Sequence, residues 1–321
     1  MKKTTKIWLV IASVLVFTGS VLFVGVMTTL GWDFKKLTTV EYETNSYEIS
    51  EAFESISIDT DRADIVFELS DDGKCRVECY EDVKAIHSVD VKKGVLTIDV
   101  DDERSWSDHI QLNFDSPRIT FFLPETDYTS LLIDNKTGDI KIPDDFRFAN
   151  AEINVSTGDV DSNATCTETI KIKASTGDIC IEHISAGSLD IDVTTGKVLV
   201  TDVICEGDIT VDVSTGKVYL TDIECRKFAS SGSTGDISLN DVIVEEKISV
   251  KRSTGDVKLD GSDAEEIYVR TDTGDVTGSL LTEKIFFTET DTGDIDVPES
   301  LEGGKIEIKT DTGDITIKIE K

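Results

Sequence analysis

The sequence contains little cysteine, proline or histidine. Its 321 residues include six cysteines, four prolines and three histidines. Six cysteines are too few for the disulfide framework of a small secreted domain, and no pair has the C-x-x-C spacing typical of zinc or redox sites. The histidines, at positions 87, 109 and 183, share no spacing. The sequence therefore contains no motif for a zinc or redox site or for histidine-dependent catalysis.

Basic residues are also scarce. There are 32 lysines and arginines against 64 aspartates and glutamates, a formal net charge of −32. Such a surface repels nucleic acid and attracts cations or cationic peptides. Strong acidity alone also keeps an extracellular β protein soluble. We therefore expect no nucleic-acid partner.

Motifs of the common enzyme classes are missing. The chain has no G-x-S-x-G, no H-E-x-x-H and no phosphate-binding glycine loop. Its repeats, described below, are short and uniform, so they leave no long loops from which a catalytic cleft is built. We expect no enzymatic activity and no cofactor.

Only one long hydrophobic run is present, and it lies near the N-terminus. Residues 7–32 carry no charge, after a basic flank at residues 1–6 that includes Lys2, Lys3 and Lys6. The run exceeds the roughly 20 residues that cross a bilayer. We predict a single transmembrane helix with its N-terminus in the cytoplasm and the remaining chain outside it. A cleaved signal peptide is the alternative.

Short alternating segments follow a polar linker at residues 33–48. Between residues 49 and 130 the chain shows runs such as "FESISID" (53–59), "IQLNF" (110–114) and "RITFFL" (118–123), separated by Gly, Asp and Asn. This period-two pattern predicts β-strands. We interpret residues 49–130 as a β-rich N-terminal part of the ectodomain.

A repeat with a glycine every 19 or 20 residues occupies residues 131–321. The glycines are Gly138, Gly158, Gly177, Gly196, Gly216, Gly235, Gly255, Gly274, Gly293 and Gly313. Two residues after and seven residues before each glycine the position is always apolar, as in Ile140 and Leu131. A fixed period of this length predicts stacked coils with a shared core. We predict an all-β chain with a β-solenoid of ten repeats; a meander of hairpins with Thr-Gly turns is the alternative.

The tetrapeptide around each glycine is almost constant. Threonine precedes glycine in all ten copies, and aspartate follows it except at Lys197 and Lys217. Glycine supplies a corner with positive φ, and stacked threonines form a ladder at the ~4.8 Å strand spacing. Stacked aspartates repel one another. We therefore interpret the two lysines as a break in a row of like charges.

The last three copies read "DTGD". They offer two carboxylates per coil, from Asp272, Asp275, Asp291, Asp294, Asp311 and Asp314. Clustered oxygens suit a hard cation such as Ca²⁺. These aspartates are candidate calcium ligands, although weak ion condensation on a solvated face is the simpler explanation for them.

Cys205 and Cys225 occupy the same offset in consecutive repeats. Stacking would make them neighbours, so a disulfide between them is conceivable, and a pair of buried free thiols is the simpler expectation.

The strands at 53–69, the segment "FFLPETDYTSLLIDNKTGDIKI" (121–142) and the serial "STGDV" copies resemble the bacterial "putative adhesin" β-repeat family. Some relatives are associated with envelope stress and resistance to membrane-active peptides. The resemblance implies a role at the cell envelope and no catalytic residues. We predict a membrane-anchored binding protein that contacts a cell-wall polymer or another protein. The alternatives are capture of cationic peptides or divalent cations on the acidic face, and a passive structural stalk.

Overall fold

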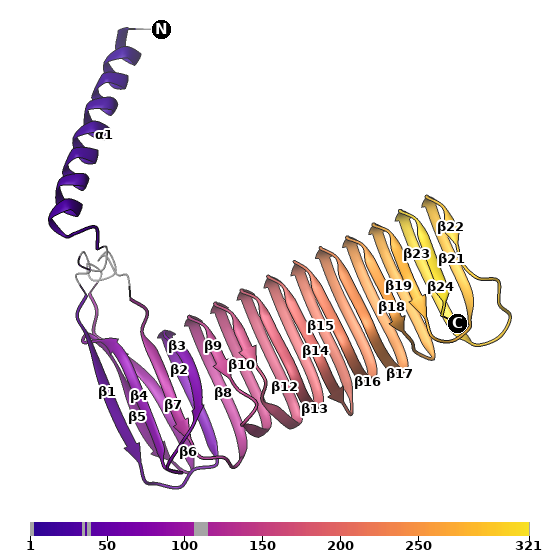
Figure 1. Cartoon of the computed structure of the whole chain (residues 1–321), viewed down its shortest axis with the longest axis horizontal. Coiled ribbons are helices and arrows are strands. Elements are labelled where there is room, and N and C mark those ends of the chain that lie inside the picture. Colours follow the sequence, from indigo (N-terminus) through magenta and orange to yellow (C-terminus); the bar gives the residue numbers. More distant parts are fainter. Residues whose placement is uncertain (1–2, 34–35, 37–39, 106–114, 321) are drawn as a thin grey trace.

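The chain folds into one long β-solenoid preceded by a single helix (Figure 1). The computed structural model describes residues 3–33, 36, 40–105 and 115–320. The strand expected at 110–114 and His109 lie outside the described residues. Helix α1 (Lys3–Thr29) contains a 25-residue apolar stretch of mean hydropathy 2.5, long enough to cross a membrane. A signal sequence meets the same criteria.

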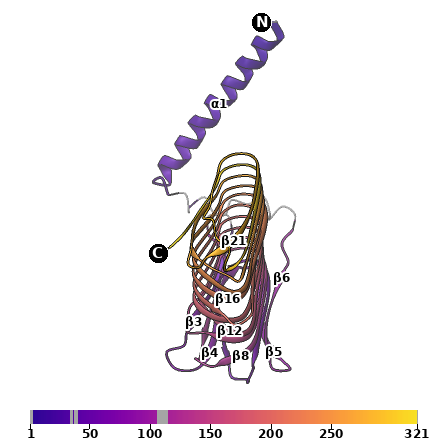
Figure 2. The ribbon, with the colours of Figure 1, turned by 90° about the vertical axis from the view of Figure 1, so that its right-hand side faces the viewer.

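Each coil has one strand before the glycine corner and one after it. The strands before the corner form one face of the solenoid, the first face, and those after it form the second face. The two faces lie opposite each other in the flattened outline seen along the axis (Figure 2). On the first face lie β8 (Asp127–Thr137), β10 (Arg147–Thr157), β12 (Thr165–Thr176), β15 (Asp208–Thr215), β19 (Glu266–Thr273), β21 (Lys284–Thr292) and β23 (Gly304–Thr312).

The second face is built from shorter strands. It contains β9 (Ile140–Ile142), β11 (Val160–Ser162), β14 (Val198–Cys205), β18 (Val257–Ser262), β20 (Val276–Leu280), β22 (Ile295–Asp296) and β24 (Ile315–Ile319). Three strands run from the second face of one coil into the first face of the next: β13 (Ile179–Thr195), β16 (Val218–Thr234) and β17 (Ile237–Thr254).

Neighbouring coils pair in parallel and in register. Thr137 lies beside Thr157, which lies beside Thr176. A meander of hairpins would give antiparallel pairs, so that alternative is wrong and the solenoid is confirmed.

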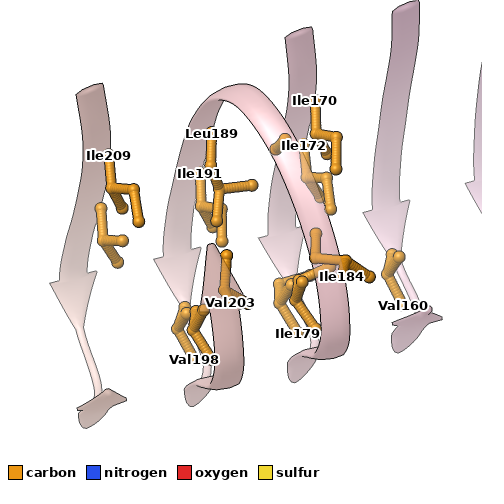
Figure 3. Packing of buried hydrophobic residues seen from close by; sticks show 14 of the residues in the cluster. Val160, Ile170, Ile172, Ile179, Ile184, Leu189, Ile191, Val198, Val203 and Ile209 are labelled. Atoms are coloured by element: carbon orange, nitrogen blue, oxygen red, sulfur yellow. The ribbon is translucent and has the colours of Figure 1, made fainter. Parts of the chain in front are cut away.

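The core is a set of apolar rows that run along the axis. Ile170, Leu189 and Ile209 form part of one row, and Ile179 and Val198 part of another (Figure 3). All five side chains are buried. Burial of one such side chain stabilises the fold by about 1.5–3 kcal/mol. A single coil has nothing to bury these residues against, so each coil depends on its neighbours.

The solenoid begins earlier than the glycine repeat. Strands β2 (Ser55–Arg62) and β3 (Asp64–Leu69) pair in parallel with β8 and β9. Ala63 occupies the place of the corner glycine, and its N–H donates to the Thr137 carbonyl at 3.0 Å. Residues 55–69 therefore form an additional coil without the tetrapeptide.

The N-terminal end is covered by strands that partly change direction. On the first face β6 (Val95–Asp102) extends the parallel sheet and β5 (Ala85–Lys92) closes it with an antiparallel pair. On the second face β7 (Arg118–Leu123) is followed by antiparallel β4 (Cys75–Asp82) and β1 (Tyr42–Ile49). These strands occupy the edge of the first coil.

The last two repeats are stacked in the reverse of their sequence order. Strand β23 pairs with β19 on one side and with β21 on the other, and β24 lies between β20 and β22 (Figure 1). The tenth repeat is thus enclosed between the eighth and the ninth. The ninth repeat therefore forms the open end of the stack, although the tenth is the last in the sequence.

A buried ion pair joins the start of the ninth repeat to the segment that precedes β19 of the eighth repeat. Lys284, at the start of β21, is 3% exposed, and its Nζ lies 2.5 Å from Asp263 Oδ1. Oδ1 also accepts the N–H of Ala264 at 2.8 Å. A buried pair of this kind stabilises little by itself, but loss of one partner leaves an uncompensated charge. The pair therefore connects the eighth and ninth repeats past the tenth, which lies between them.

The crossed order can be tested with paired cysteines. Thr273 and Thr312 are in-register neighbours, whereas Thr312 separates Thr273 from Thr292. Adjacent parallel strands place Cα atoms about 4.8 Å apart, within the range of a disulfide. The double variant T273C/T312C should form a disulfide under mild oxidation, detected by non-reducing peptide mapping. Crosslinking in T273C/T292C instead would show that the repeats stack in sequence order.

Candidate functional site

The corner that carries the tetrapeptide is built by glycine. The ten repeat glycines have φ between +129° and +158°. A Cβ on any of them would lie 1.7–2.2 Å from a backbone carbonyl oxygen of the neighbouring coil. Any other residue would therefore clash as well as strain the backbone. Stacked corners approach this closely because their glycine N–H groups donate to threonine carbonyls of the next coil at 2.9–3.1 Å.

The aspartates that follow the glycines, except Asp294 at the open end, each accept a hydrogen bond from the next coil. The backbone N–H of Asp159 donates to Asp139 Oδ1 at 2.9 Å, and that of Asp178 donates to Asp159 Oδ1 at 2.7 Å. The same contact recurs along a row that we call the acidic ladder, in spatial order Asp64, Asp139, Asp159, Asp178, then Asp236, Asp256, Asp275, Asp314 and Asp294. A carboxylate that accepts a backbone N–H makes a charge-assisted hydrogen bond. The sequence analysis missed this structural role.

The two lysines interrupt the acidic ladder between Asp178 and Asp236. Lys197 donates its backbone N–H to Asp178 Oδ1 at 2.7 Å, and its Nζ lies 3.9 Å from Asp178 Oδ2. Lys217 Nζ lies 2.9 Å from Asp236 Oδ2. This hydrogen bond, helped by the N–H of Asp256, lowers the pKa of Asp236. Each lysine therefore neutralises a neighbouring carboxylate, in agreement with the interpretation that it relieves repulsion.

The candidate calcium ligands lie on three successive coils at the C-terminal end. Their spatial order is Asp272 and Asp275, then Asp311 and Asp314, then Asp291 and Asp294. Among these described residues, no three carboxylate oxygens from different side chains come within 4.8 Å of one another. Asp275 and Asp314 each use one oxygen to accept a backbone N–H. Calcium binding at these residues stays a prediction.

Two shallow hollows lie on the first face beside the corners. Hydroxyl side chains two residues before the glycines line them, and we call the two hollows together the hydroxyl groove: Ser156, Ser175, Thr194, Ser214, Ser233 and Ser253. The hollow around Ser156 and Ser175 has a volume of about 260 Å³, and that around Ser233 and Ser253 has a volume of about 410 Å³. Charged residues four positions before the glycines form its other wall, including Lys173.

A second buried polar cluster lies near the N-terminal end. Cys79, Glu81 and His87 place potential ligand atoms within 4.8 Å of one another, and all three are buried. His87 Nδ1 lies 2.6 Å from Glu81 Oε2, and His87 Nε2 lies 2.8 Å from the Thr60 hydroxyl. Asn45 donates to Glu81 Oε1 at 2.8 Å. The sequence analysis missed this cluster, although Cys79 and Glu81 share a strand face by period two.

The cysteines are free thiols in the structure. Cys205 and Cys225 are both buried and unbonded, as the simpler expectation had it. The Cys225 thiol donates to the Lys227 carbonyl at 3.4 Å. Burial raises the pKa of Cys75, Cys79, Cys166 and Cys225 to about 12. These thiols stay protonated at neutral pH and are poor nucleophiles.

Comparison with known proteins finds a family model and solved structures that are similar to this chain. The model of the family Toastrack DUF4097 matches residues 53–211 and 204–321. A solved "putative adhesin" from Parabacteroides distasonis is 15% identical over 88% of this chain and 98% of its own, with a TM-score of 0.47. A "putative adhesin" from Parabacteroides merdae is 14% identical over 88% and 98%, with a TM-score of 0.39.

A "putative lipid binding protein" from Parabacteroides distasonis is 14% identical over 88% of this chain and 98% of its own, with a TM-score of 0.36. These values are too low to transfer a ligand from those proteins. None of the curated proteins matches the chain.

The structural role of the acidic ladder predicts different effects for two substitutions of one residue. Asp256 Oδ1 accepts the N–H of Asp275 at 2.9 Å. D256A removes the acceptor and should lower the free energy of unfolding by about 0.5–1.5 kcal/mol. D256N keeps an acceptor oxygen and removes a repelling charge, so it should leave stability unchanged or raise it. Urea unfolding of both variants measures this, and equal destabilisation by D256N would count against the hydrogen-bond account.

The pairing of Lys217 with Asp236 predicts a pKa change. K217M removes the main cause of the lowered pKa of Asp236, so this pKa should rise toward its ordinary value. A carboxylate with a lowered folded-state pKa stabilises the fold above its unfolded pKa and loses that contribution as the pH falls through the folded value. NMR titration of the Asp236 carboxyl carbon measures the change. The matched control is K258M, because Lys258 pairs with Asp260 instead; an equal shift there would refute the assignment.

Proposed function

The chain belongs to the Toastrack DUF4097 family, whose model matches residues 53–211 and 204–321, and from that premise we propose that it is a non-enzymatic binding protein of the cell envelope. The observation that carries the proposal is the repetition of one surface along the axis. The hydroxyl groove and the acidic ladder present equivalent side chains on successive coils, at the ~4.8 Å strand spacing. A repeated surface suits an elongated partner that touches many coils.

Helix α1 supports membrane anchoring. Its apolar stretch, Thr5–Thr29, is exposed along almost its whole length, and Met27 is the one buried residue in it. We propose that it spans the membrane once, with Lys2, Lys3 and Lys6 on the cytoplasmic side and the solenoid outside. In this arrangement the solenoid would extend from the membrane surface toward the wall.

The described chemistry supports binding rather than catalysis. The most buried histidine, His87, has both ring nitrogens occupied by Glu81 and Thr60. His183 Nδ1 lies 2.7 Å from Asp202 Oδ2, and both side chains are exposed. Neither histidine lines the hydroxyl groove, and the buried thiols are protonated. We therefore propose an adhesin-like role.

The favoured partner is a wall polymer or another protein of the envelope. A polymer that contacts several coils gains affinity because each further contact becomes intramolecular. Hydroxyl groups of the groove offer hydrogen bonds that salt does not screen. The acidic ladder adds exposed charges, and salt weakens their interactions with a partner because the Debye length is only about 10 Å at 0.1 M.

Co-sedimentation with isolated cell walls tests this function. The full-length chain in detergent micelles should bind saturably to the cell walls. Binding should persist when the salt concentration is raised from about 0.05 M to about 1 M, at which exposed charges are screened. Loss of binding at high salt would favour electrostatic capture over adhesion. Absence of saturable binding at either salt concentration would favour the stalk.

Capture of cations or cationic peptides is the second candidate, favoured by the acidic ladder. Calorimetric titration with Ca²⁺ and with a cationic peptide at low salt would show saturable heat if this function holds. The triple variant D272S/D291S/D311S should then weaken binding, since it removes three carboxylates from adjacent coils. The matched control is D134S/D192S/D212S, which removes three acidic side chains elsewhere on the first face.

A further inference from the structure

The buried ion pair between the eighth and ninth repeats is shielded from water. Asp263 lies in the segment that leads into β19, and Lys284 begins β21. Lys284 Nζ lies 2.5 Å from Asp263 Oδ1, and the two side chains are 3% and 12% exposed. The pair of Lys258 with Asp260 has the same separation, but its side chains are 55% and 34% exposed. The two pairs therefore differ in burial and not in distance.

The backbone holds Asp263 in place. Its N–H donates to the Val242 carbonyl at 3.0 Å, and its carbonyl accepts the N–H of Val244 at 2.9 Å. Ile204 and Ile243 occupy the same position in earlier coils and are 55% and 40% exposed. Asp263 continues this outward row, and only its own position in the row is buried among these three residues.

The Lys284 side chain reaches Asp263 past the tenth repeat. Lys284 pairs in register with Gly304. A Cβ on Gly304 would lie 2.2 Å from the Glu265 carbonyl oxygen and 3.4 Å from Lys284 Cδ. The stem of the lysine therefore runs close beside Gly304, from the ninth repeat toward the eighth.

The carboxylate of Asp263 is only half satisfied. Its Oδ1 accepts the N–H of Ala264 at 2.8 Å and contacts Lys284 Nζ. Its Oδ2 is buried and has no hydrogen-bond partner. Lys284 Nζ also donates to the Thr282 hydroxyl. A buried carboxylate oxygen without a partner is costly, so an ion pair does not explain this arrangement completely.

An amide between Lys284 Nζ and Asp263 Cγ accounts for all of these atoms. Oδ1 becomes the amide oxygen and keeps the N–H of Ala264. The single amide N–H keeps the Thr282 hydroxyl as its acceptor. Oδ2, the oxygen without a partner, is the atom that the reaction removes. No polar atom of the product then lacks a hydrogen bond.

We propose that Lys284 and Asp263 form an intramolecular isopeptide bond. Proton transfer from the ammonium to the carboxylate gives a neutral amine and a neutral acid, which a buried site favours over two charges. The Nζ lone pair then forms a bond to Cγ, and the Cγ–Oδ2 bond breaks. Oδ2 leaves as water, with the acid proton and one proton from Nζ, and nothing is oxidised or reduced.

The surroundings favour this condensation in two ways. The Ala264 N–H, 2.8 Å from Oδ1, stabilises the negative charge that develops on this oxygen as Nζ attacks. The fold holds amine and acid together, so the reaction is effectively unimolecular.

The bond closes a covalent ring from residue 263 to residue 284. It fastens the ninth repeat, which forms the open end of the solenoid, to the eighth repeat past the enclosed tenth. The inference goes beyond the proposed binding function, because it concerns a covalent modification of the scaffold and does not depend on any ligand.

Tryptic peptide mapping of the purified full-length chain tests the bond. Trypsin does not cleave after an acylated lysine, so the chain should stay uncleaved at Lys284. We expect a branched fragment that joins residues 259–270 to residues 271–305 and is lighter by one water than the two peptides together. Tandem mass spectrometry should place the branch between Asp263 and Lys284.

Three variants identify the residues that react. K284R and D263A should each give no branched fragment, because either change removes one reacting group. The matched control is K258R, which alters the exposed pair with Asp260 and should leave the branch intact.

The map of the unmodified chain is decisive even if K284R or D263A does not fold. The proposal is overturned if trypsin cleaves this chain completely after Lys284. Loss of water confined to the peptide of residues 259–270 would mean a cyclic imide at an aspartate, and this outcome also overturns it.

Discussion

The close approach of corner to corner is the constraint on which the rest of the structure depends. Each glycine faces a backbone carbonyl of the neighbouring coil at a distance that excludes any Cβ. This contact keeps the coils in register, because a slip of one residue would bring a side chain against the carbonyl. With the register held, apolar residues at each offset stack into continuous rows, and the aspartate after the glycine meets the N–H of its equivalent in the next coil.

The period and the core could be predicted from the sequence, since both follow from residues at constant offsets. The positions represented by Leu131 and Ile140 are apolar in every repeat, and the structure buries them in all coils but the outermost. The role of the aspartates could not be predicted in this way. Charge alone suggested repulsion, whereas the hydrogen bond depends on where a neighbouring backbone N–H points.

A search for sequence patterns could not predict two further features, for different reasons. The coil at residues 55–69 lacks the tetrapeptide, because Ala63 stands where the other coils have the corner glycine. On its outer side, strand β3 of this coil pairs with β7 instead of with another repeat. Ser230 and Arg252 each break the apolar pattern of the core, and the structure brings them together in a hydrogen bond of 2.9 Å between neighbouring coils. Exceptions of this kind coincide in space rather than in sequence, so a pattern search does not connect them.

The reversed order of the last two coils follows from how well each repeat fills the core. The tenth repeat offers Ile306, Ile308 and Ile315, which are all fully buried. The ninth has Thr288 at the offset of Ile308, and its Ile295 is 45% exposed. Enclosing the more apolar repeat buries its three isoleucines between two neighbouring coils. The threonine of the ninth repeat then lies at the solvent end, where its hydroxyl stays hydrated and the free-energy cost of burying it is avoided. The spacing between glycines is the same in either order, so only the identity of the buried residues distinguishes the two stacking orders.

The open edge is formed by the ninth repeat, which fills a core less well than the tenth, and it carries the charges of Glu289, Asp291 and Asp294. Charged side chains on an edge strand discourage further pairing, so the repeat that ends the stack also limits its growth.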